Sequence, residues 1–170
     1  MPVTTTELVA QIRLTSDLKA SRFWEDADIL QATNDSLAEL YDILVQAREG
    51  YFQTSALLAL VSNSSNLPTD FYKELGLSAG NVDAHSAWRI PPLESFNDRF
   101  DSTGYWIASR VLTVYPTNIA PPVPVTLTYV PNCPVLLLAD PIPVDLERFR
   151  EYLAVSVSIK IKNARAQDAT

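Results

Sequence analysis

The clearest hydrophobic pattern in the chain runs from Arg22 to Tyr51. Apolar residues recur there at helical spacings, as on a helix with one buried face: Leu30, Leu37, Tyr41 and Leu44, widened by Ile29, Leu40 and Val45. Polar residues step by three or four along the opposite side: Asp28, Gln31, Asp35, Glu39, Asp42, Gln46 and Glu49. The pattern therefore predicts one long helix with a packing face and an acidic face.

Two further helices are predicted near the ends of the chain. Thr4 and Glu7 have the spacing of a capping box, and the apolar residues after them predict a first helix to about Leu14. The segment from Val144 to Ala166 fits a helical stripe, but part of it also alternates like a strand. Its length and a cap at Asp145 favour a helix. Residues 162–170 have no pattern, so we expect a frayed tail.

The middle of the chain has the character of strands. The apolar run from Phe52 to Val61 fits a buried helix or a strand, and the turn-forming residues after it favour a strand. Glu74 to Ala79 is a further strand candidate, and Leu93 to Phe100 suits a short helix or turn. Two aromatic and β-branched runs between Tyr105 and Tyr115, with a third from Val123 to Val130, predict an antiparallel meander of about three strands.

These elements together predict an α+β fold. We expect a helical bundle with a long central helix and N-terminal and C-terminal helices, into which the antiparallel β meander is inserted. A length of 170 residues predicts a single domain over residues 1–170. The first residues have neither the apolar region of a signal peptide nor the length of a membrane span, so we expect synthesis in the cytoplasm and no membrane partner.

Charge and residue types argue against several functions. A formal net charge of -7 and a pI near 4.6 argue against a nucleic-acid groove, which needs clustered Lys and Arg. Cys133 is the single cysteine and His85 the single histidine, and the nucleotide-binding and hydrolase motifs are missing. Carboxylates of Asp26, Asp28 or Asp140 could form a metal or acid–base pair, but acidic spacing on one helix face is most often a solvated surface. We predict no enzyme, no metal and no cofactor.

The order of these segments resembles the head-to-tail adaptor proteins of tailed bacteriophages, also called connector or head-completion proteins. The pieces that carry the resemblance are DADIL and LAELYD between Asp26 and Asp42, LPTDFYKELG from Leu67 to Gly76, and the aromatic hairpin that ends in Tyr115. None of them is a catalytic signature, and the likeness lies in their joint order. The family often has a Ser or Thr cap where this chain has Trp24 and Glu25.

The resemblance implies a structural virion protein. Such proteins form a ring, commonly of twelve copies, under the portal at the capsid vertex, where the ring extends the DNA channel and docks the next neck or tail component. DNA would pass through without specific binding. The alternative from another class is a monomeric peptide- or glycan-binding module that uses aromatics of the meander, among them Trp88 and Trp106. A hydrolase with paired carboxylates is a third and weaker hypothesis.

Three sets of residues are candidates for these contacts. Carboxylates that would face the channel and repel DNA phosphates are Asp28, Asp35, Asp42 and Glu49. The subunit or neck interface would use Tyr105 and Trp106. Portal docking would use the compact basic cluster of Lys160, Lys162 and Arg165, although cations near a helix C-terminus also complement the helix dipole.

Overall fold

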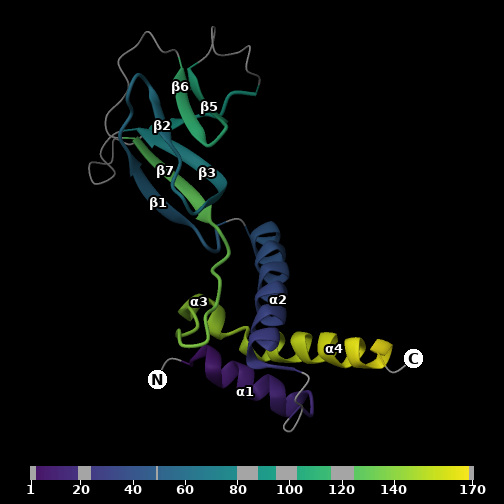
Figure 1. Ribbon diagram of the computed structural model, residues 1–170. Helices are drawn as coiled ribbons and strands as arrows, with labels where there is room; N and C mark the ends of the chain where they lie inside the picture. Colours follow the sequence, from purple (N-terminus) through teal and green to yellow (C-terminus); the bar gives the residue numbers. More distant parts are fainter. Residues whose placement is uncertain are drawn as a thin grey trace. The chain divides into compact units, whose positions relative to one another are not determined.

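The computed structural model describes residues 3–18, 24–48, 50–79, 88–94, 103–115 and 125–168. It divides the chain into two compact units (Figure 1). Met1–Ile43 and Cys133–Thr170 form a helical unit, and Leu44–Asn132 form a β unit. The helical unit therefore combines the two ends of the sequence, and the β unit is its middle.

Helix α1 of the helical unit spans Thr5–Thr15, so the first predicted helix is confirmed. Its predicted capping box is present, because the Glu7 backbone N–H donates to Thr4 Oγ1 at 3.3 Å and the Thr4 N–H donates to the Glu7 carboxylate at 3.0 Å. The two bonds satisfy backbone donors that the first turn of a helix otherwise leaves open.

Helix α2 spans Asp26–Ala47, which confirms the long predicted helix with somewhat shorter bounds. The expected apolar stripe lies on its inner face, with five side chains that are buried: Ile29, Leu37, Leu40, Tyr41 and Val45. Leu30 and Leu44 are half-buried. The periodicity of the sequence therefore identified the packing face correctly.

The last predicted helix is present, but it is interrupted. Helix α3 spans Val144–Glu147 and helix α4 spans Arg150–Asp168, which continues into the range predicted as a frayed tail. Helices α1 and α4 pack together, and the hydroxyl groups of Ser16 and Ser158 lie 3.0 Å apart between them. The strand-like alternation of the sequence has a simple cause: α4 carries apolar residues on two faces, of which one is buried.

Polar side chains tie the segment before α3 to the other two helices. Asn34 of α2 accepts a hydrogen bond from the Leu136 N–H at 2.8 Å and donates to the Leu136 carbonyl at 3.2 Å. The Thr5 hydroxyl of α1 donates to the Asp140 carbonyl at 3.0 Å. These bonds satisfy backbone groups that have no regular secondary structure of their own.

The β unit contains two antiparallel sheets. The first has the order β1-β7-β3-β4, with β1 at Thr54–Leu58, β7 at Val125–Pro131, β3 at Phe71–Ala79 and β4 at Trp88–Ile90. The second has the order β2-β6-β5, with β2 at Ser64–Asn66, β6 at Val111–Tyr115 and β5 at Gly104–Ala108. The strands predicted at residues 52–61, 74–79 and 105–115 are therefore confirmed.

Both sheets contribute to one apolar core. Leu77, Val125 and Leu127 of the first sheet and Leu112 and Val114 of the second belong to the same buried cluster. The segment Pro91–Leu93 joins the sheets, because the Tyr105 N–H donates to the Pro91 carbonyl at 3.0 Å and the Leu93 N–H donates to the Tyr105 carbonyl at 2.9 Å. This shared core makes the β unit a packed body rather than a ribbon.

The prediction of a helical bundle with an inserted β meander is wrong, although the mixed α+β character is confirmed. Strands β5 and β6 form the expected hairpin, but β7 lies in the other sheet, between β1 and β3. The alternation of Val123 to Val130 indicates a strand but carries no information about its partner, and strands that follow one another in the sequence are not neighbours here. The helix or turn predicted for Leu93 to Phe100 falls mostly outside the described residues.

Candidate functional site

Three of the predicted channel-facing carboxylates lie on the outer face of α2. Asp28, Asp35 and Asp42 are exposed and follow one another at intervals of seven residues, whereas Glu49 lies outside the described residues. Asp35 accepts a hydrogen bond from the Gln31 side chain at 2.9 Å. The face is therefore acidic and open to solvent within its own unit, which is compatible with a channel wall and equally with an ordinary solvated surface.

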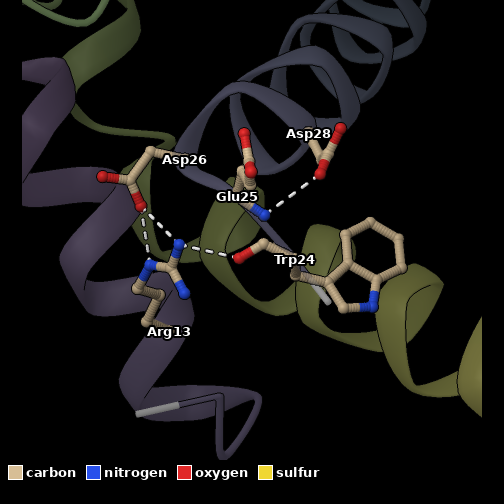
Figure 2. Close-up of polar contacts among 5 residues, drawn as sticks. All are labelled: Arg13, Trp24, Glu25, Asp26 and Asp28. Atoms are coloured by element: carbon tan, nitrogen blue, oxygen red, sulfur yellow. Dashed lines mark hydrogen bonds and ion pairs between the residues drawn. The ribbon is translucent and has the colours of Figure 1, made fainter. Parts of the chain in front are cut away.

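The start of α2 has no Ser or Thr cap, and other polar contacts stabilise it (Figure 2). Asp28 turns back and accepts the Glu25 N–H at 3.0 Å, which is the function of the acidic residue in a capping box. Arg13 of α1 lies 2.6 Å from the Asp26 carboxylate and donates to the Trp24 carbonyl at 2.8 Å. Two of the first-turn carboxylates thus hold the helix end in place, and neither is arranged as part of an acid–base pair.

The predicted docking cluster at the C-terminal end separates into two parts. Lys160 lies 2.9 Å from both carboxylate oxygens of Glu39 on α2, so this cation has a partner within its own unit. Lys162 and Arg165 are exposed and have no ion pair within the described ranges. Only these two cations are therefore available to a partner in the way that the sequence suggested.

Beside these cations lies a surface that the sequence reasoning missed. Tyr152, Val155 and Ile159 are 48%, 51% and 53% exposed and follow one another at spacings of three and four, with Lys162 three residues further. We call these four residues the outer α4 stripe. The opposite face of α4 is buried through Leu153, Val157 and Ile161. The signal that could have revealed the stripe was the alternation of Val155, Val157, Ile159 and Ile161, which shows an apolar residue on each side of the helix.

The predicted interface aromatics lie on β5 and are not equally accessible. Tyr105 is 3% exposed and belongs to the core of the β unit, so little of it remains for a second subunit. Burial, followed by the negative charge of Glu74, raises the pKa of Tyr105 to about 12. Trp106 is half-buried and makes contacts of its own.

The groups that could support catalysis are placed without a common site. Burial and then the charge of Asp42 raise the pKa of the half-buried Cys133 thiol to about 11, so it stays protonated and a poor nucleophile at neutral pH. His85 lies outside the described residues. Within the ranges that the structure describes, no three His, Cys, Asp or Glu side chains are arranged to hold a metal ion.

No protein-family model matches the chain, and no curated protein matches its sequence. Across the described residues, every helix is too short or too polar to cross a bilayer. The candidate site is therefore defined by its own residues: the outer α4 stripe with Arg165 beside it, and the acidic face of α2.

Proposed function

We propose that this chain is a structural subunit of the head-to-tail connector of a tailed bacteriophage, that it assembles as a ring at the capsid vertex, and that α4 contacts the portal. The observation that carries the proposal is the outer α4 stripe. One buried apolar face is enough to hold a helix on its own domain, yet α4 has a second one that remains exposed in a single copy. Apolar side chains gathered on one exposed element are typical of protein contacts.

The basic side chains of Lys162, within the stripe, and of Arg165, beside it, support a partner that is acidic. Lys162 continues the line of Tyr152, Val155 and Ile159, and Arg165 lies one turn further. Cations of neighbouring copies would repel one another if this end packed against itself in a ring, whereas an acidic portal surface would attract them. Lys160 is not part of the proposed contact because Glu39 already binds it.

The outer face of α2 supports the same function in a different way. If Asp28, Asp35 and Asp42 face the channel, each copy adds to one negative wall that repels DNA phosphates. DNA would then slide through the ring without binding to it. The next neck or tail protein would dock on the side of the ring away from the portal, and the proposed role requires no catalytic group.

The test is mass photometry and electron microscopy of the protein with and without the portal ring of the same phage. We expect rings, or adaptor-bound portals, from the wild type and loss of both from Val155→Asp and Ile159→Asp. Val144→Asp is the matched control, because Val144 is 80% exposed but lies on α3, outside the stripe. Circular dichroism must show that all variants fold. Unchanged portal binding by both stripe variants, or a wild type that stays monomeric and unbound, contradicts the proposal.

A charge-reversal pair tests the acidic partner separately. Lys162→Glu with Arg165→Glu should weaken portal binding most at low salt, because added salt screens exposed charges. Lys160→Gln is the control, since it removes only the internal pair with Glu39. The alternative of a peptide- or glycan-binding module rested on aromatics of the meander. Trp106 is half-buried and makes contacts of its own, and the side chain of Trp88 is not among those that the structure describes, so no observation favours binding through these aromatics.

A further inference from the structure

A groove of about 320 Å³ lies in the β unit where the chain passes from the first sheet to the second. Its lining comes from the connection that follows β1, from β2 and from the start of β6: Ala59, Val61, Ser64, Ser65, Asn66 and Val111. Among the described strands, β1 pairs only with β7 and β2 pairs only with β6. The groove is therefore bordered by the outer edge of β2 and by the residues that follow β1.

The groove occupies the place of a missing pair in a hairpin. Val61 and Ser64 exchange backbone hydrogen bonds of 2.8 and 3.0 Å around a two-residue turn. In an antiparallel hairpin the next hydrogen-bonded pair lies two residues further along each strand, here at Ala59 and Asn66. No hydrogen bond joins these two residues, and both line the groove. The hairpin opens because β1 continues into one sheet and β2 into the other.

Backbone groups of Asn66 face this opening. The Asn63 carbonyl accepts the Val114 N–H at 2.8 Å and the Leu67 N–H donates to the Arg110 carbonyl at 2.9 Å, so these odd-numbered residues are directed at β6. Alternate residues of a strand face opposite edges, which directs the N–H and carbonyl of Asn66 away from β6. The Asn66 carbonyl accepts a hydrogen bond of 3.3 Å from Ser65 Oγ, and the Asn66 N–H has no partner among the described residues.

Apart from the short length of β2, the border of the groove lacks the features that usually protect a free edge. Natural edge strands carry charges, prolines or bulges that prevent a further strand from pairing. Residues 52–67 contain no charged side chain and no proline, and the register of β1 with β7 has no bulge. Leu57 and Val61 are 70% and 76% exposed. In a chain of net charge -7 this neutral border matches a neutral segment, since a charge buried there would have no counter-charge.

We infer that this groove binds an extended, uncharged peptide segment of a partner protein, which adds to the edge of β2 through the backbone of Asn66. Strand addition of this kind draws its affinity from main-chain hydrogen bonds, and pockets for alternate side chains give specificity. The inference does not depend on ring assembly, because the groove lies wholly within the β unit of one copy.

The test is an NMR titration of the full chain with a blocked peptide, acetyl-VTLTYV-amide. This sequence is that of residues 125–130, an uncharged strand that already pairs with β1 on its inner edge. We expect amide shifts at the groove residues and at least tenfold slower exchange of the Asn66 amide. The same peptide with Asp in place of its second Thr should bind at least tenfold more weakly.

Two variants examine the backbone contact itself. Asn66→Pro removes the N–H that faces the groove and takes no bond from the ladder with β6, so binding should fall at least tenfold. Asn66→Ser, which keeps the N–H, should bind like the wild type. If the proline variant does not fold, the charged peptide and the Asn66 exchange rate decide. Two results with peptide overturn the inference: no amide shifts at millimolar peptide, or equal binding of the charged peptide. It is also overturned if the same residues shift with protein concentration in the absence of peptide, because the edge would then bind a second copy of the chain.

Discussion

Ser36 is the buried side chain for which the structure makes the sharpest stability prediction. It is 1% exposed on the inner face of α2, and its hydroxyl has no hydrogen-bond partner among the described residues. A buried polar group without a partner costs about 1 to 3 kcal/mol, and Ala has a higher helix propensity than Ser by about 0.5 kcal/mol. Ser36→Ala loses no hydrogen bond and leaves only a small cavity. We therefore expect it to stabilise the helical unit by about 1 to 2 kcal/mol.

The matched control is the same substitution at Ser158. That residue is 3% exposed, and its hydroxyl donates to the Ala154 carbonyl at 2.6 Å and lies 3.0 Å from Ser16 Oγ. Removing those two contacts should destabilise the unit by about 1 to 2 kcal/mol, because each buried hydrogen bond contributes about 1 kcal/mol and the higher helix propensity of Ala offsets about 0.5 kcal/mol. Urea unfolding followed by circular dichroism at a helical wavelength measures both variants. Equal effects of the two substitutions, or a loss of stability in Ser36→Ala, would refute the reasoning.

Three further predictions concern the two cores. Leu37→Asp should lower the free energy of unfolding by at least about 4 kcal/mol and abolish cooperative melting, because it places an unpaired charge in a fully buried position. The control, Asp35→Asn on the outer face, should melt like the wild type. Gly104→Ala should destabilise the β unit by about 1 to 3 kcal/mol, since a Cβ there would lie 2.6 Å from a Leu93 side-chain carbon and 2.9 Å from the backbone carbonyl oxygen of Pro91. A calorimetric scan with an unchanged melting temperature would contradict this. Burial raises the pKa of Tyr105 from 10.0 to about 12, so the folded protein holds the phenol proton more tightly than the unfolded chain does. The stability that this difference provides is complete below pH 10 and is lost as the pH rises through 12. Tyr105→Phe should flatten the alkaline loss of stability measured by urea midpoints between those pH values, and an identical alkaline profile would count against the assignment.

Local features of the fold were predictable from the sequence. The capping box at Thr4, the inner face of α2 and the β5–β6 hairpin depend on interactions between residues close in the chain, and periodicity or spacing records such interactions directly. The hairpin turn shows the limit of this method. Ser109 and Arg110 adopt positive φ angles of 50° and 63° without the Gly or Asn that favours them, so the sequence gives little warning of the turn geometry.

Pairing and exposure were decided by the tertiary structure. The alternating pattern of β7 is compatible with any neighbouring strand, provided that the apolar face of β7 is buried. Only the packing of the whole β unit places β7 between β1 and β3 instead of beside β6. The same applies to the charges of α4. Lys160 pairs with Glu39 of α2, which is far away in the sequence, whereas Lys162 is exposed, and the sequence pattern does not distinguish the two lysines.

The sequence by itself determined where most helices and strands form, because those choices follow from neighbours three, four or two residues away. It did not indicate the short strands β2 and β4 or the break between α3 and α4. The tertiary structure alone decided which of two apolar faces of α4 is buried, which strand edges remain open and which charges are paired. Those outcomes depend on residues far apart in the chain, such as Ser16 with Ser158 and Glu39 with Lys160, and no local pattern encodes the distance between them.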